Sequence, residues 1–376
     1  MIPFNKPYLT GKETEYITKA VASGKISGNG IYTKKCQEFF EKTWGIKKTL
    51  LTTSCTDALE MAALLIDIKE GDEVIMPSYT FVSTANAFVL RGATIIFADS
   101  QENHPNIDAD KIEKLITSKT KVIVPVHYSG IACDMDKIME LADRFNLFVV
   151  EDAAQAIDSY YKGRPLGSIG HLATFSFHET KNVISGEGGL LAINDEQFID
   201  RAEIIWEKGT NRSAFFRGEI DKYGWVDIGS SFLPSEIVAA FLWAQLEHLE
   251  DIQKRRMYIW NKYYNALKVI NKKGEVDLPC MPNYSTNNAH MFYLVCKNKQ
   301  HRLALISLLK KENIMAVFHY LSLHKSQFYI DKHDGRELSY SDNYSDCLVR
   351  LPLYYELEEE ELNKVIQLVK FYFLEC

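Results

Sequence analysis

The sequence has little of what stabilises disulfide-bonded or metal-binding proteins. Its 376 residues include seven cysteines, an odd number, and none of them forms a CxxC pair. Cysteines scattered in this way favour reduced thiols over a disulfide framework or a zinc site. We therefore expect a cytoplasmic protein with no bound metal.

An excess of basic residues is also missing. Lysine and arginine total 43 against 50 aspartates and glutamates, which leaves a formal net charge of -7. Nucleic acids and anionic membranes are bound by basic patches. We therefore expect neither as a partner, and an anionic substrate would have to be held by local groups.

Long apolar runs and nucleotide-binding glycine motifs are missing too. No run approaches the roughly 20 apolar residues of a membrane span, and the N-terminal stretch MIPFNKPYLTGKE lacks the apolar core of a signal peptide. Neither GxGxxG nor GxxxxGK[ST] occurs. A dinucleotide-binding oxidoreductase or a P-loop NTPase therefore has no fingerprint here.

Short apolar runs alternate with helix-like segments between about residues 50 and 193. This pattern predicts βαβ units and a mostly parallel sheet. The expected buried strands lie at 72–77, 93–99, 121–127, 147–152, 173–177 and 189–194. Helical periodicity is found at 56–66, 135–145 and 196–209.

A second helical region at 234–267 changes from apolar to charged near Glu247. We place a domain boundary there, with a large domain at 1–247 and a small C-terminal α+β domain at 248–376. Apolar or periodic segments at 289–296, 302–314 and 359–373 supply the elements of the small domain. The expected fold class is α/β.

Ligands of α/β sheets bind at the carboxyl ends of the strands, so the polar residues found there are candidates for chemistry. Asp152 directly follows the apolar run LFVV. A carboxylate in that place suits pyridoxal 5′-phosphate (PLP), whose pyridine nitrogen must stay protonated if the ring is to withdraw electrons. The alternative is that Asp152 caps a helix over the following AAQAI.

Two earlier segments suit other parts of the same cofactor. The turn TTSCTD at 52–57 places hydroxyls, including Ser54 and Thr56, before a helix, where backbone N–H groups bind phosphate. Phe81, in a loop after Pro77, is able to lie flat on a pyridine ring. Simple helix capping and burial in a core are the respective alternatives.

The stretch FSFHETKNVISGEGG at 175–189 carries a lone lysine, Lys181, between a strand-like run and a glycine cluster. Glycines allow close approach to a ligand, and partial desolvation would lower the pKa of Lys181 and free its amine as a nucleophile. Ser176 lies five residues earlier. A solvated loop lysine is the alternative, but the order of phosphate turn, aromatic, carboxylate and lysine favours a PLP site with Lys181 as the Schiff-base residue.

A longer series of segments extends this order: TTSCTDALEMA, MPSYTFVSTANA, IFADS, PVHYSG, FVVEDAAQA, FSFHETKNVISGEGG and FHYLSLH. Together they resemble the DegT/DnrJ/EryC1/StrS family of sugar aminotransferases along nearly the whole chain. The resemblance implies a fold-type I PLP-dependent transferase, like aspartate aminotransferase. Its large domain would hold a mostly parallel seven-stranded sheet. Family members aminate keto-sugars attached to nucleotides and are dimers with each site built from both chains.

The resemblance also implies roles for individual residues. Lys181 is the catalytic lysine, and the cofactor PLP, or its pyridoxamine form, is bound by Ser54, Cys55, Thr56, Phe81, Asp152, Gln155, Ser176, Lys181 and Ser231. Gln155 lies by the cofactor ring and Ser176 joins the phosphate binders. Ser231 belongs to a GSSFL stretch that replaces the family's more common GYNYR, so its hydroxyl takes the place of an asparagine that reaches the partner subunit's cofactor phosphate.

The substrate side is implied in the same way. The stretches EKGTNRSAFFRG, DIGSSF and MAVFHY resemble those of members that supply an amino sugar for enterobacterial common antigen. The implied substrates are dTDP-4-keto-6-deoxy-D-glucose and L-glutamate. The implied products are dTDP-4-amino-4,6-dideoxy-D-galactose and 2-oxoglutarate.

Four residues are candidates for substrate contact. His319 and Tyr320 fall where the family places groups on the sugar side, and Arg212 and Arg217 are able to neutralise a pyrophosphate. Burial in a core and ordinary solvation in a loop are the respective alternatives.

Other functions stay open. A related aminotransferase would give the gluco epimer or act at C3 of the sugar. The 3-dehydratase branch of the family has histidine in place of the lysine, so Lys181 argues against it. A non-catalytic PLP-binding regulatory protein would be expected to lose Lys181 or Asp152, or to carry an added DNA-binding domain.

Overall fold

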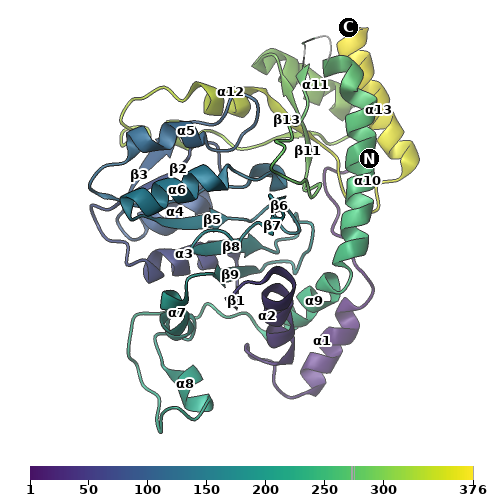
Figure 1. Ribbon diagram of the computed structural model, residues 1–376. Helices are drawn as coiled ribbons and strands as arrows, with labels where there is room; N and C mark the ends of the chain where they lie inside the picture. Colours follow the sequence, from purple (N-terminus) through teal and green to yellow (C-terminus); the bar gives the residue numbers. More distant parts are fainter. Residues whose placement is uncertain (272–273, 275, 376) are drawn as a thin grey trace.

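The computed structural model describes residues 1–271, 274 and 276–375. Its centre is a seven-stranded sheet with the order β1-β9-β8-β5-β4-β2-β3 (Figure 1). The strands are β1 (Lys48–Thr52), β2 (Glu73–Pro77), β3 (Thr94–Ala98), β4 (Thr120–Ile123), β5 (Phe148–Asp152), β8 (Leu172–Ser176) and β9 (Gly189–Ile193). The expected fold class is confirmed.

The directions of the strands bring several carboxyl ends to one edge. Each neighbouring pair from β3 to β8 is parallel, and β9 alone runs in the opposite direction, antiparallel to both β8 and β1. The six strands expected from the sequence all form. The resemblance implied a seventh strand without locating it; that strand is β1, which pairs along its length with β9, with Thr52 opposite Gly189.

Helices cover both faces of this sheet (Figure 1). They are α1 (Glu13–Ala22), α2 (Ile31–Trp44), α3 (Cys55–Leu65), α4 (Val82–Val89), α5 (Ala109–Ile112), α6 (Met135–Phe145), α7 (Ile199–Trp206), α8 (Arg212–Phe216) and α9 (Glu236–Leu246). Adjacent residues of β1 face opposite cores: Leu51 packs in the core that includes α2, α6 and α9, and Leu50 in the core that includes α3, α4 and α7. Burial on both faces explains why the strands read as continuous apolar runs.

A smaller unit follows in the chain and forms a four-stranded antiparallel sheet with the order β10-β11-β13-β12. Its elements are α10 (Leu249–Asn271), β10 (Val276–Asp277), β11 (Phe292–Cys296), α11 (Lys299–Lys311), β12 (Val317–Phe318), α12 (Ser339–Cys347), β13 (Leu348–Leu351) and α13 (Glu359–Leu374). The helical region expected at 234–267 is divided into α9 and α10, and the expected boundary after residue 247 falls between them. No helix in the described part of the chain is long and apolar enough to cross a bilayer.

Short elements complete the chain: the hairpin strands β6 (Tyr160–Tyr161) and β7 (Arg164–Pro165), and the 3-10 turns η1 (Glu113–Leu115), η2 (Tyr128–Gly130), η3 (Glu196–Phe198) and η4 (Leu323–Lys325). The N-terminus lies beside α10 and α13 rather than on the large sheet (Figure 1). There Ile2 bridges to Ile314 and packs in the core of the smaller unit. The N-terminal segment therefore connects the two units.

Candidate active site

A cavity of about 770 Å³ lies at the edge of the large sheet where the parallel strands end. Its walls come from the loops after β2, β5 and β8, from the start of α3 and, on the other side, from the smaller unit and the N-terminal segment. The sequence candidates that line it are Ser54, Cys55, Thr56, Phe81, Asp152, Gln155, Ser176, Lys181, His319 and Tyr320. The fold thus brings together ten candidates that are far apart in the chain.

Asp152 is the last residue of β5 and is buried. Its Oδ2 accepts a hydrogen bond from Thr84 Oγ1 at 2.7 Å, and its Oδ1 accepts one from the N–H of Ala154 at 3.1 Å. Turns follow instead of a helix, so the alternative that Asp152 caps a helix is wrong. Among the described residues it has no cationic ion-pair partner, although its charge acts on Lys181.

The preceding residue, Glu151, anchors this strand end from the other face of the sheet. It is fully buried, and its carboxylate accepts from His127 Nε2 at 2.9 Å and from the N–H groups of Gly167, Ile169 and Gly170. Burial acts to raise the pKa of Glu151, but these hydrogen bonds and the charge of His127 outweigh it, and the net pKa is lowered. A carboxylate held by four donors fixes the position from which Asp152 projects.

The turn before α3 lies at the base of the cavity. Ser54 caps the helix by accepting from the N–H of Asp57 at 3.0 Å, so the capping alternative holds and is compatible with lining the cavity. The N–H groups of Cys55 and Thr56 come earlier in the first turn and have no acceptor within the helix. Burial raises the pKa of the Cys55 thiol to about 12, which leaves it a neutral group.

Gly189, the last residue of the glycine cluster, packs directly on this turn. A Cβ at this position would lie 2.3 Å from the carbonyl carbon of Ser54 and 2.4 Å from the nitrogen of Cys55. Gly186 has a φ of +80°, the left-handed conformation that glycine adopts at little cost. The cluster therefore turns the chain sharply after Lys181 and seats β9 against the start of α3.

Lys181 is partly buried in the loop between β8 and β9. Burial lowers the pKa of its amine; Cys55 and Asp152 oppose this effect and Arg350 adds to it. The next residue, Asn182, is buried and bonds to His290 Nδ1 and to the carbonyl of Asn288. The loop is thus tied to the smaller unit, and the alternative of a freely solvated lysine is wrong.

Phe81 precedes α4 and is 54% exposed, so the alternative of a core phenylalanine is wrong. Its ring centroid lies 6.0 Å from that of Tyr320 across the cavity.

Tyr320 and His319 form a stacked pair, with ring centroids 3.5 Å apart. The hydroxyl of Tyr320 accepts a hydrogen bond from Gln155 Nε2 at 2.9 Å. His319 is buried, and its Nδ1 lies 2.7 Å from the hydroxyl of Tyr128. Burial lowers the pKa of His319 well below its ordinary value.

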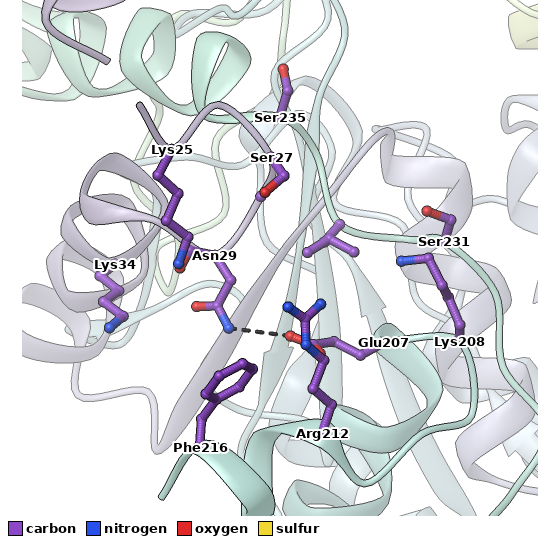
Figure 2. Close-up of a pocket in the computed structure, with 12 residues that line it drawn as sticks. Lys25, Ser27, Asn29, Lys34, Glu207, Lys208, Arg212, Phe216, Ser231 and Ser235 are labelled. Atoms are coloured by element: carbon purple, nitrogen blue, oxygen red, sulfur yellow. Dashed lines mark hydrogen bonds between the residues drawn. The ribbon is translucent and has the colours of Figure 1, made fainter. Parts of the chain in front are cut away.

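Three candidates lie elsewhere. Ser231 and Arg212 line a second cavity, of about 540 Å³, which shares no lining residue with the first. Figure 2 shows Arg212 pointing into it, and Asn29 donates there to Glu207 at 3.3 Å. Lys25, Lys34 and Lys208 also line it.

Arg217, the third of these candidates, lines neither cavity. Glu203 and Glu219 bind its guanidinium at 2.6 Å each.

Sequence reasoning missed several residues of the first cavity, above all Arg350 of β13 and His290. Arg350 is a charged residue within the apolar run LVRLPL at 348–353, and that contrast is the signal that could have revealed it. No sequence pattern marks Thr84 as the residue that donates a hydrogen bond to Asp152, because this contact depends on α4 packing near the end of β5. Among the described residues, no group of three or more His, Cys, Asp or Glu side chains is able to hold a metal ion.

The residues of the first cavity fit PLP on three counts. The carboxylate of Asp152 lacks a cation, which a protonated pyridine nitrogen would supply. The start of α3 offers backbone N–H groups to a phosphate. The amine of Lys181 has no acidic ion-pair partner among the described side chains and is shifted by burial toward its reactive neutral form.

Comparison with known proteins supports the same assignment. Residues 7–370 match the model of the DegT/DnrJ/EryC1/StrS aminotransferase family. The spore coat polysaccharide biosynthesis protein SpsC of Bacillus subtilis is 34% identical over 98% of this chain and 96% of its own length. GDP-perosamine synthase of Escherichia coli O157:H7 is 37% identical over 73% of this chain and 74% of its own.

Solved structures agree with these relatives. The sugar aminotransferase Spr1654 of Streptococcus pneumoniae, in its PMP form, superposes with a TM-score of 0.91 at 26% identity, covering all of both chains. DesV of S. venezuelae has a TM-score of 0.90 at 28% identity, covering 100% of this chain and 99% of its own. From its fold, its cavity and these relatives, the chain belongs to the DegT/DnrJ/EryC1/StrS aminotransferase family and is a PLP-dependent sugar aminotransferase.

Proposed function

We propose that this chain is a dTDP-4-amino-4,6-dideoxygalactose transaminase. It transfers the amino group of L-glutamate to C4 of dTDP-4-keto-6-deoxy-D-glucose. One observation supports the transaminase activity above all others. Lys181, Asp152 and the start of α3 line the same cavity, and neither Lys181 nor Asp152 has an ion-pair partner among the described residues. The identity of the sugar rests on the sequence resemblance described above.

The residues of the cavity have separate tasks in this proposal. When bound, PLP supplies the electron-withdrawing ring that stabilises negative charge on the carbon next to the transferred nitrogen. Lys181 would hold the cofactor, and its amine, whose pKa burial lowers, would then be available to move a proton at the substrate carbon. Asp152, held by Thr84 and the N–H of Ala154, would keep the pyridine nitrogen protonated.

The remaining residues position the cofactor and the sugar. Ser54, Cys55, Thr56 and Ser176 would hold the phosphate, and Phe81 and Gln155 would hold the ring. His319 and Tyr320 contact the sugar. Their stacking, and the bonds from Tyr128 and Gln155, hold both rings in place before substrate arrives.

A second copy of the chain completes the site in this proposal. Ser231 and Arg212 line a cavity that shares no residue with the first, so they are able to serve the chemistry only at another subunit's site. They belong to the segment between α7 and α9, which extends away from the sheet at α8 (Figure 1) and returns to the core at Phe232. This segment exposes Trp225 and Phe216, at 85% and 68%. Apolar exposure of this extent favours an interface, and we infer a homodimer.

The basic second cavity is the proposed site of the substrate's diphosphate, which Arg212 would bind together with Lys25, Lys34 and Lys208. Arg217 is not included, because Glu203 and Glu219 already balance its charge. The named activity of the GDP-perosamine synthase relative favours a second candidate substrate, a GDP-linked keto-sugar.

We place the reaction in the cytoplasm, in the synthesis of a cell-surface polysaccharide such as enterobacterial common antigen. The six cysteines of the described residues are all unpaired, in line with a reducing compartment. The SpsC relative is named for polysaccharide biosynthesis.

The first experiment is the visible absorbance spectrum of the purified protein with PLP, before and after L-glutamate. A band that forms, and that glutamate removes, supports the proposal; a protein that stays colourless refutes it. The glutamate-treated enzyme is then given dTDP- or GDP-linked 4-keto-6-deoxy sugar, and NMR of the product identifies the aminated carbon and its configuration. A gluco product or amination at C3 would overturn the proposed sugar specificity, but the protein would still be a transaminase.

A further inference from the structure

The cavity contains a partly buried cation that the roles above leave unused. Arg350 of β13 lines it and has no ion-pair partner among the described residues. Its Nε is buried without a hydrogen-bond partner. One Nη donates to the carbonyl of Phe318 at 3.3 Å, and its Cζ lies 4.5 Å from the ring centroid of Phe4. Most of this guanidinium's donors therefore have no acceptor among the residues that the structure describes.

The groups around Arg350 do not balance its charge. Those that act on it are the hydroxyls of Tyr79, Tyr128 and Tyr320, and burial raises the pKa of each, so that they stay neutral. Its charge acts in turn on His290, His319 and Lys181, all bases. Of the residues that the structure describes, two carboxylates line the cavity: Asp152, held by Thr84, and the exposed Glu187.

A charge that is partly withdrawn from water and has no partner costs free energy, so such a group is usually matched by an opposite charge. No described side chain supplies one here, which points to a ligand. The flat guanidinium, with its parallel N–H donors, matches the two oxygens of a carboxylate. The other anions of the proposed reaction have separate places: the cofactor phosphate at the start of α3 and the diphosphate in the basic second cavity.

We propose that Arg350 binds a carboxylate of the amino donor and thereby selects an amino acid for the first half of the reaction. This inference rests on the proposed function. Val317, two residues before His319, pairs with Arg350 in the small sheet, so the donor's carboxylate and the sugar are bound by adjacent strands of the smaller unit. The donor and the sugar then occupy overlapping space in turn, as a two-step transfer requires.

The test compares Arg350→Gln with Arg302→Gln. Arg302 is a matched control: it is buried in the same unit, its Nε also lacks a partner, and it packs against Phe318, yet it does not line the cavity. In the PLP-loaded enzyme, the L-glutamate concentration that half-removes the visible band should rise about 100-fold in R350Q. It should stay within about threefold of wild type in R302Q.

A second measurement uses protein without cofactor. Glutarate, a dicarboxylate that has no amine to react, is titrated into each protein and followed by calorimetry. Wild type and R302Q should bind glutarate, and R350Q should not. Arg350→Lys should bind it weakly, because lysine keeps the positive charge but lacks the parallel N–H donors of the guanidinium. Because this titration needs no bound PLP, its outcome is independent of the colour test of the proposed function.

The wild-type enzyme alone also tests the proposal if R350Q does not fold. L-Glutamate is compared with L-glutamine and L-isoglutamine, each of which has one carboxylate replaced by an amide. At least one amide should be a donor about 100-fold poorer, and that one identifies which carboxylate binds Arg350. Equal use of all three, or wild-type glutamate and glutarate binding in R350Q, would overturn the assignment.

Discussion

Asn182 and His290 are hydrogen-bonded at 2.9 Å between Oδ1 and Nδ1, and this bond ties the loop of Lys181 to the smaller unit. The amide of Asn182 also donates to Gln253 Oε1 and to the carbonyl of Asn288, each at 2.8 Å. Because Lys181 is the preceding residue, the position of its amine depends on how the two units pack.

Replacing Asn182 with alanine should lower the free energy of unfolding by about 2 kcal/mol, because buried partners lose their hydrogen bonds. Cofactor binding should weaken as well, since the loop loses its anchor. Urea unfolding of the cofactor-free protein measures the first effect. Asn283→Ala, at an exposed position, is the control and should stay within about 0.5 kcal/mol of wild type. An unchanged midpoint in N182A would show that the anchor contributes nothing.

The amine of Lys181 should react with an acylating reagent at a lower pH than its ordinary pKa of 10.5 allows, because burial disfavours the ammonium form. The rate of labelling of the Lys181 peptide in the cofactor-free protein, followed by mass spectrometry across pH, gives the midpoint. Asp152→Asn should move that midpoint further down, since the negative charge of Asp152 raises the pKa of Lys181. A midpoint at or above 10.5, or an upward shift in D152N, contradicts the electrostatic account.

The same depressed pKa implies a pH dependence of stability. Between the folded-state pKa of Lys181 and 10.5, the unfolded chain binds more protons than the folded one, so this residue's contribution to stability rises with pH across that window. Lys181→Met removes the titrating group and should flatten the rise, which urea midpoints of the cofactor-free proteins measured across that window detect.

Phe81→Ala should weaken PLP binding about tenfold, the effect of losing one aromatic stack. The free energy of unfolding should stay within about 0.5 kcal/mol of wild type, because the side chain is 54% exposed. PLP titration monitored by absorbance measures the affinity. Leu90→Ala, 69% exposed just beyond the other end of α4, is the control for removing an apolar side chain. Equal affinities of F81A and wild type would remove Phe81 from the site.

A heterodimer of Lys181→Ala and Arg212→Gln should regain about half of the wild-type activity, while each variant alone is impaired. The reason is that one of its two sites would combine an intact Lys181 with an intact Arg212 from the other chain. Differently tagged, co-expressed chains allow the heterodimer to be purified. The Lys181→Ala and Asp152→Asn pair is the control, because both lesions lie in one chain's own cavity and no intact site forms. An inactive first heterodimer would show that Arg212 does not act across subunits.

Much of the large sheet follows from local pattern. The helix expected at 135–145 coincides with α6, because its apolar residues recur with helical spacing and Asn146 ends it in the left-handed conformation. The strands that end at Asp152 and Ser176 were expected because their residues are apolar on both faces of the sheet. β1 was missed because only Leu50 and Leu51 of KTLLT are apolar, and its pairing with β9, distant in sequence, makes it a strand.

The sequence by itself determined the class of chemistry: strand ends that present Asp152 and Lys181, a turn before α3 able to bind phosphate, and an order of motifs that indicates the family. These are local properties, read along the chain. Tertiary structure decided what depends on contacts between distant segments. It placed Thr84 against Asp152, joined Asn182 to His290, and separated Ser231 and Arg212 from the first cavity. It also left Arg350 partly buried, with no acid partner among the described residues. Burial and pairing are set by which segments pack together, and no local pattern encodes them.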